Sequence, residues 1–323
     1  MKKIKSFISL ILRLTVSAAL LVLLFKFNHI DLSALMADLK KADKLFLIIG
    51  FLIFILTYFL GFLRWQMLLK SAGITASLKK LVVSFSGGVF FSIFLPSTIG
   101  GDIVRTADLA EHTRKTKEVI ASVFLDRLSG YVGLVIVIIP AFLLGGSLVR
   151  DRFVFMSLAA IASLLILVLL VLFNNFFYLK ISGFLSAPGA GRIKDALKNL
   201  HNEIHSFRSR KEMIFNNLIL SFIIQLISPI SVYFIGLALG VKINIIYYFI
   251  FLPIIGAVTL LPISIGGLGL REYLFVIYFA KAAVAKQLAV AMSLLSFSFI
   301  VLYGAIGGLI YVLAVHHRRL QRN

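Results

Sequence analysis

The sequence predicts an all-α polytopic membrane protein with about six transmembrane helices and two re-entrant helical hairpins, arranged as an inverted-topology internal repeat. Three observations lead to this fold class. Hydrophobic residues make up 60% of the chain and charged residues only 14%, whereas roughly a quarter of a soluble domain is charged. Apolar runs of about 20 residues recur along the chain. One unusual motif occurs twice, at 95–101 and 261–267, with the copies 166 residues apart.

The apolar runs predict six transmembrane spans, because about 20 residues of helix cross a hydrocarbon core of ~30 Å. We expect them at 6–25, 45–63, 118–144, 153–174, 214–239 and 288–314. The first run follows three lysines but is longer than the apolar core of a signal peptide, and no clear cleavage site follows it. We therefore interpret it as an uncleaved first span.

Two further apolar stretches are interrupted and predict hairpins at 81–111 and 245–281. In the first, a short second helix is expected at about 102–111, after the break. In the second, the corresponding piece is expected at about 268–281. Eight full spans with proline kinks are the alternative, since segments of about 15 residues can tilt or stretch.

The tips of these hairpins are the two copies of the motif, Leu-Pro-Ser-Thr-Ile-Gly-Gly and Leu-Pro-Ile-Ser-Ile-Gly-Gly. Broken backbone at membrane depth must face protein or water, because lipid cannot satisfy its polar groups. Paired interruptions in two halves are the best sequence indication of a transport site. The predicted tip residues are Pro96, Ser97, Thr98, Gly100, Gly101, Pro262, Ser264, Gly266 and Gly267.

The basic residues predict the orientation, since Lys and Arg accumulate on the cytoplasmic side. With the N-terminus inside, 21 of the 33 basic residues fall in inside segments and 9 in outside segments. We expect an integral protein of the cytoplasmic (inner) membrane with both termini in the cytoplasm. Each half, 1–150 and 151–323, has three spans and one hairpin. Because three is odd, the second half should be inverted and the two tips should meet near the midplane.

The connection between the halves contains an amphipathic helix at about 191–210. Its apolar residues recur at spacings of three and four: Ile193, Leu197, Leu200, Ile204 and Phe207. Such a helix fits an anionic cytoplasmic leaflet. A plain connector is the alternative.

Ionisable residues at membrane depth are costly and mark a functional site by default. The candidates are Asp102, Arg105, Asp126, Arg127, Arg271 and Glu272. Their charges sum to zero. The helix after each Gly-Gly pair should direct free N–H groups at an anion, and arginine suits bidentate phosphate binding. The carboxylates would hold the arginines, bind a cationic head group or carry a coupling proton.

Structural explanations stand beside two of these assignments. Arg105 also satisfies the positive-inside rule. Arg127 lies only about two turns into its helix and can snorkel to the surface or form a local lock.

Several function classes lose support. The chain has no cysteine, and His201 and His205 do not follow the order of a zinc-protease motif. No P-loop, nucleophile elbow or RNA-binding module is present. We expect no cofactor, no metal site, no nucleic-acid partner and no enzymatic activity.

The two motif copies with their arginines, at 95–105 and 261–272, and the pair Asp126 and Arg127 resemble the flippase-like integral membrane family. That family includes the transmembrane region of lysylphosphatidylglycerol synthase. The resemblance covers nearly the whole chain and implies translocation of an aminoacylated phospholipid or a polyprenyl-linked glycan. No aminoacyl-transferase domain is expected here, because the chain ends at Asn323 after a basic tail.

The expected function is that of a lipid flippase or scramblase with a polar midplane site, moving a phospholipid or a polyprenyl-phosphate-linked lipid between leaflets. Membrane lipids with anionic or phosphate-bearing head groups are the expected partners, and a homo-oligomer is compatible with the sequence. Two alternatives are open. One is a non-transporting subunit that regulates a lipid- or glycan-modifying enzyme, and the other is a secondary transporter of a soluble anion.

Overall fold

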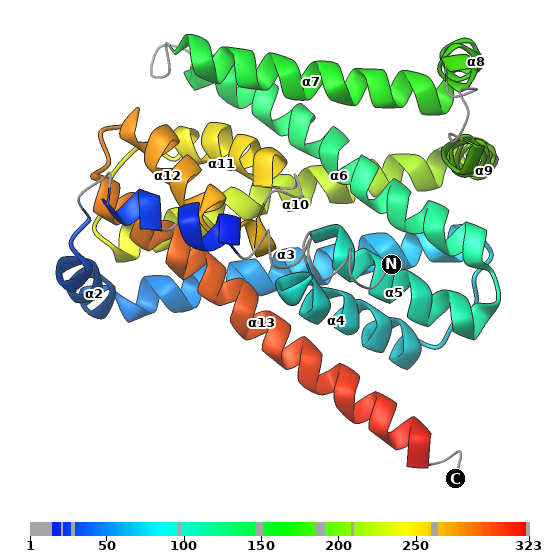
Figure 1. The fold of residues 1–323 in the computed structure, drawn as a ribbon, viewed down its shortest axis with the longest axis horizontal. Coiled ribbons are helices and arrows are strands. Elements are labelled where there is room, and N and C mark those ends of the chain that lie inside the picture. Colours follow the sequence, from blue (N-terminus) through cyan, green and yellow to red (C-terminus); the bar gives the residue numbers. More distant parts are fainter. Residues whose placement is uncertain are drawn as a thin grey trace.

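The structure is a computed structural model, and all its regular elements in the described residues are helices (Figure 1). It describes residues 15–20, 22–26, 30–95, 98–145, 151–184, 191–207, 210–259 and 264–320. The helices are α2 (Leu32–Lys41), α3 (Lys44–Ser71), α4 (Leu78–Phe94), α5 (Thr98–Thr113), α6 (Thr116–Gly145), α7 (Arg152–Phe173), α8 (Asn175–Phe184), α9 (Gly191–Phe207), α10 (Lys211–Ala238), α11 (Ile246–Thr259), the 3-10 turn η1 (Ile265–Gly267), α12 (Leu270–Ala280) and α13 (Lys286–Leu320). The all-α polytopic class is confirmed.

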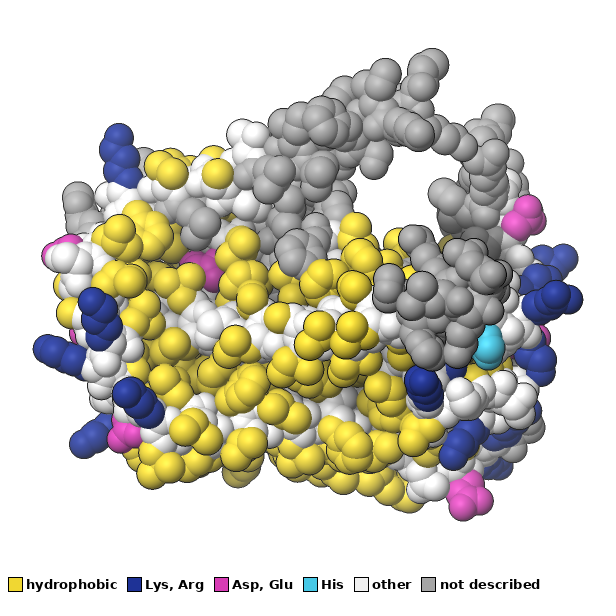
Figure 2. Space-filling model, turned by 90° about the horizontal axis from the view of Figure 1, so that it is seen from below, with side chains coloured by type: hydrophobic (Ala, Val, Ile, Leu, Met, Phe, Trp, Pro, Cys, Tyr) yellow, Lys and Arg dark blue, Asp and Glu magenta, His cyan; other side chains and the backbone are white. Residues whose placement is uncertain are grey.

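Five helices are long and apolar enough to cross a membrane: α3, α6, α7, α10 and the first 30 residues of α13. They confirm five of the six predicted spans. Of the sixth, residues 15–20 and 22–25 are helical and 6–14 lie outside the described residues. The prediction for α3 ended too early, because this helix continues to Ser71, about two turns beyond residue 63. Figure 2 shows the resulting surface, an apolar belt with Lys and Arg side chains at its two ends.

The two ends of the molecule differ in their helices. At one end, which we call the α2 face, the N–H of Asp43 donates to Ala238 O at 2.9 Å and Lys281 pairs with Asp151. These contacts join the start of α3 to the end of α10, and the start of α7 to the end of α12. At the other end, the α9 face, helices α8 and α9 lie across α7 (Figure 1). Neither α2 nor α8 was predicted from the sequence.

Each predicted hairpin is a pair of short packed helices, α4 with α5 and α11 with α12. Lys80 on α4 donates to Asp108 on α5 at 2.7 Å, and this buried ion pair holds the first hairpin together. Equivalent elements of the two halves also make equivalent contacts, since α4 packs on α13 and α11 packs on α6. The inverted orientation of the halves stays a prediction.

The second tip lies against the end of α4. A Cβ atom added at Gly266 would lie 3.5 Å from the carbonyl oxygen of Ile93. Residues Pro96, Ser97 and Pro262 lie outside the described part of the chain. The second tip therefore contacts the helix that leads into the first motif copy, and the meeting of the two tips stays a prediction.

The backbone of the glycine pairs corrects one expectation. In the first copy the pair does not precede the helix, because α5 begins at Thr98 and Gly100 and Gly101 lie in its first turn. In the second copy Gly266 and Gly267 have left-handed φ values of 58° and 78°, and α12 begins only at Leu270. The Gly-Gly pair is therefore part of a helix in the first copy and has a left-handed conformation in the second.

Gly101 is required by close packing within the first hairpin. A Cβ atom there would lie 2.0 Å from the carbonyl oxygen of Gly88 on α4, an atom that cannot rotate away. We expect Gly101→Ala to force α4 and α5 apart and to cost about 1–3 kcal/mol of unfolding free energy, measured by thermal or denaturant unfolding. Gly61→Ala is the control, because its added methyl group meets no atom within 4 Å; equal stability of the two variants would refute this packing.

The amphipathic helix predicted at 191–210 is α9, but its apolar stripe contacts protein as well. Ile204 and Phe207 are buried, and Ile204 belongs to one apolar cluster with Leu128 of α6 and Leu165 of α7. His201 stacks on Tyr178 of α8 at a centroid distance of 4.0 Å. The helix is thus anchored to the helical body at the α9 face.

Candidate functional site

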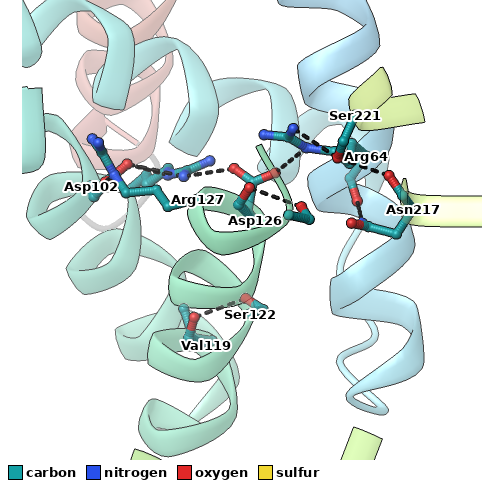
Figure 3. Close-up of polar contacts among 10 residues, drawn as sticks. Arg64, Asp102, Val119, Ser122, Asp126, Arg127, Asn217 and Ser221 are labelled. Atoms are coloured by element: carbon teal, nitrogen blue, oxygen red, sulfur yellow. Dashed lines mark hydrogen bonds and ion pairs between the residues drawn. The ribbon is translucent and has the colours of Figure 1, made fainter. Parts of the chain in front are cut away.

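A buried ionic cluster joins α3, α5 and α6. Asp126 on α6 accepts hydrogen bonds from Arg64 Nε at 2.8 Å and from Arg105 Nη2 at 3.0 Å. Asp102 on α5 accepts one from Arg105 Nε at 3.0 Å and pairs also with Arg127 of α6. Each carboxylate is therefore shared by two guanidinium groups. Figure 3 shows Asp126 with Arg64 on one side and with Asp102 and Arg127 on the other.

The helix geometry places this cluster inside the membrane-spanning region. Asp126 stands ten residues beyond Thr116, the first residue of α6, or about 15 Å along the helix axis. Because α6 has 30 residues, Asp126 lies about a third of the way along a helix that is long enough to cross a membrane. Charges at such a depth persist only when they are paired or reach water, and the shared carboxylates supply that pairing.

The members of the cluster differ in exposure. The side chains of Arg64, Arg105, Asp102 and Asp126 are 7–14% exposed, whereas that of Arg127 is 26% exposed. Arg105 is also held by aromatic rings, with its guanidinium carbon 4.8 Å from the centroid of Trp65. This cation–π contact adds to the ion pairs. Arg127 is the most exposed of the three arginines. An anion therefore reaches it while removing less water from the surrounding side chains than it would at Arg64 or Arg105.

Arg64 comes directly after the predicted span 45–63, and the sequence analysis counted it among the basic residues of the inside segments. Its place in the buried cluster corrects that assignment. The longer α3 carries it into the buried region, where Nη1 also donates to Ser221 Oγ of α10 at 3.1 Å. Asn217, one turn earlier on α10, donates to the carbonyl oxygen of Arg64 at 3.5 Å. Asn217 and Ser221, spaced by four within the predicted span 214–239, were the sequence signal for this contact.

Including Arg64 changes the charge of the site. The sequence predicted three arginines against three carboxylates, with no net charge. In the structure the cluster on α3, α5 and α6 holds three arginines and two carboxylates. If all of them are ionised, one positive charge is not balanced within the cluster. An anion is the natural ligand for such a charge.

Arg271 and Glu272 form a second group, on α12 and α13. Arg271 donates to Glu272 Oε1 at 2.7 Å and to Ser293 Oγ at 3.0 Å, and its guanidinium carbon lies 4.6 Å from the ring centroid of Phe297. Glu272 is fully buried and accepts a hydrogen bond from the N–H of Gly269 at 2.6 Å. The acid thus occupies one N–H at the start of its own helix, that of Gly269, so this group is not free for an anion.

The two motif arginines have related partners. Arg105 bonds to Asp126, 21 residues later, and Arg271 bonds to Ser293, 22 residues later. In each half the motif arginine is thus tied to the long helix that follows its hairpin. The first half has a carboxylate at this position and the second a hydroxyl, so the two halves differ chemically. A substrate role for Arg271 and Glu272 stays a prediction.

Among the remaining tip residues, Ser264 is the one with a buried polar side chain. Its side chain is buried, and its hydroxyl has no hydrogen-bond partner in the part of the chain that the structure describes. The turn η1, which contains Gly266 and Gly267, begins at the next residue, Ile265. Thr98 is the first residue of α5.

Comparisons with known proteins agree with the fold. The UPF0104 membrane protein PH1989 of Pyrococcus horikoshii is 26% identical over 282 residues, which cover 80% of this chain and 83% of that protein. A UPF0104 membrane protein of Methanothermobacter thermautotrophicus is 24% identical over 278 residues, covering 78% and 80%. No solved structure matches the chain. The family model described as the lysylphosphatidylglycerol synthase TM region matches residues 10–308, nearly the whole chain. The chain is therefore an integral membrane protein of the lysylphosphatidylglycerol synthase transmembrane-region family.

Proposed function

We propose that this protein is a lipid flippase or scramblase that binds the phosphate of a membrane lipid at the cluster formed by Arg64, Arg105, Arg127, Asp102 and Asp126. The single observation that carries the proposal is the charge of this cluster, three guanidiniums against two carboxylates. A phosphodiester with one negative charge would neutralise it. Arginine binds phosphate bidentately through its planar fork.

Binding would begin at Arg127, because its side chain is the most exposed in the cluster. The phosphate then competes with Asp102 for Arg127 and for Arg105. Asp102 and Arg105 belong to the first hairpin, whereas Asp126 and Arg127 belong to α6. Exchange of partners would therefore loosen the hairpin from α6, which is the kind of coupling that an alternating-access transporter needs.

A lipid is favoured over a soluble anion by the surface beside the cluster. Ile103, next to Asp102 on α5, is 65% exposed, and Ile120 on α6 is 48% exposed. Within the bilayer, exposed apolar side chains suit contact with hydrocarbon rather than an aqueous path. A head group at the cluster would leave its acyl chains in the surrounding lipid.

The proposal includes an orientation. Basic residues are more numerous in the segments of the α9 face, which supports a cytoplasmic location for that face and for both termini. The membrane is then the cytoplasmic one. Transport of this kind needs no covalent chemistry and no cofactor, and it predicts a phospholipid or a polyprenyl-phosphate-linked lipid as the substrate.

Leaflet transfer in proteoliposomes tests the proposal. The purified chain is reconstituted in phosphatidylcholine vesicles with a trace of acyl-labelled phosphatidylglycerol, phosphatidylcholine or polyprenyl phosphate, and the label that reaches the outer leaflet is followed by chemical quenching. We expect faster transfer than in protein-free vesicles, most of all for the lipid with one negative charge. No acceleration for any of the three would refute the proposed function.

A further inference from the structure

A second feature of the α9 face lies beside α6 and does not involve Arg127. Helices α3, α6, α7, α9 and α10 line an open-sided cavity of about 260 Å³. Its walls are formed by Leu68, Leu125, Leu128, Ser129, Val132, Leu169, Phe173, Phe207, Met213, Ile214, Asn217 and Leu218.

The cavity is apolar in character. Two of its lining side chains are polar, and each donates one hydrogen bond to a backbone carbonyl: Ser129 Oγ to that of Asp126 at 3.0 Å, and Asn217 Nδ2 to that of Arg64 at 3.5 Å. A water molecule needs two to four polar partners, whereas ten of the twelve lining residues have apolar side chains. The cavity therefore suits a hydrocarbon chain.

Two positively charged residues stand next to wall residues of the cavity in the sequence. Phe207, Met213 and Ile214 belong to its wall, and between them in the sequence stand Arg210 and Lys211, both exposed. The guanidinium carbon of Arg210 lies 5.8 Å from the ring centroid of Phe207. The neighbouring Glu212 lines a different groove, together with Lys70. An apolar cavity with two cations beside it is complementary to an anionic amphiphile.

We propose that this cavity binds one acyl chain of an anionic phospholipid, whose phosphate is held at the surface by Arg210 and Lys211. The occupant would come from the leaflet in contact with α9, which lies across this end of the molecule (Figure 1). The site does not rest on the proposed transport function. Its phosphate contacts are on α10, whereas those of the ionic cluster are on α3, α5 and α6.

Photolabelling with a lipid that carries a diazirine near the middle of one acyl chain tests the site. The full chain is placed in phosphatidylcholine nanodiscs containing labelled phosphatidylglycerol or labelled phosphatidylcholine, and the modified peptides are identified by mass spectrometry. We expect phosphatidylglycerol to label the wall segments around Leu128, Leu169 and Ile214 above the level of the lipid-facing surface. Labelling confined to that outer surface, or equal cavity labelling by both lipids, would overturn the proposal.

Two variants sharpen the test. Arg210→Gln with Lys211→Gln removes both cations from the surface, so folding should be unaffected and the preference for phosphatidylglycerol should fall by about 20-fold. The matched control is Lys41→Gln with Lys44→Gln, two exposed lysines at the α2 face. Ile214→Trp should block cavity labelling by filling the partly buried wall. If the preference survives removal of both cations, the phosphate assignment is wrong, whatever the transport assay shows.

Discussion

Replacement of Asp126 by alanine is expected to lower the free energy of unfolding by about 3–5 kcal/mol, the usual cost of removing one partner from a buried ion pair. Asp126 accepts hydrogen bonds from both Arg64 and Arg105, and its side chain is only 8% exposed. Its loss leaves two guanidiniums facing each other at membrane depth. Charges there are costly without a counter-ion.

Thermal unfolding of the purified variants in one detergent or nanodisc measures this effect. Ser122→Ala is the matched control, because Ser122 is buried one turn earlier on α6 and its hydroxyl bonds only to the carbonyl oxygen of Val119 on the same helix (Figure 3). Adding Arg64→Gln to Asp126→Ala should recover part of the loss by removing one unpaired charge. If Asp126→Ala unfolds at the same temperature as Ser122→Ala, the cluster does not stabilise the fold.

Replacement of Arg127 by glutamine is expected to slow lipid transfer by about 10- to 100-fold, the effect of losing one charged hydrogen-bonding group. Stability should change little, because Arg127 is the most exposed member of the cluster and Asp102 keeps its bond to Arg105. The two effects separate substrate binding from folding. Initial transfer rates in proteoliposomes, with equal amounts of folded protein, measure the effect on lipid transfer.

Two further variants test the chemistry of that arginine. Arg127→Lys keeps the charge but loses the planar fork, so its transfer rate should lie between those of the wild type and Arg127→Gln. Arg152→Gln is the control, because Arg152 is an exposed arginine at the start of α7. A transfer rate for Arg127→Gln equal to that of the control would remove Arg127 from the proposed site.

The sequence predicted the fold and most of the cluster for one physical reason, which is that lipid penalises polar groups so strongly. Apolar runs of sufficient length therefore predict transmembrane spans, and ionisable residues within these spans are expected to form ion pairs or hydrogen bonds. Arg64 was missed because the span was ended at the first charge after the apolar run. The following Met67, Leu68 and Leu69 continue the apolar pattern, and the structure shows that α3 includes them.

The backbone conformation of the two hairpin tips could not be predicted from the sequence. Both copies contain Ile-Gly-Gly, yet Gly101 is helical and Gly267 is left-handed. Glycine allows both conformations at similar energy, so the surroundings decide between them. In the first copy Gly101 packs against the backbone of Gly88, and in the second Glu272 caps the helix that follows. Neither contact can be read from the motif.

Direct observation of a phosphate at the ionic cluster is the decisive test of the proposed function. The measurement is a cryo-electron microscopy map of the full chain in nanodiscs that contain the lipid with the fastest transfer. The account predicts phosphate density within hydrogen-bond distance of Arg127 and Arg105, with Asp102 displaced from at least one of them. A map in which Asp102 and Asp126 keep all their arginine partners, while head-group density lies elsewhere in the protein, would contradict it.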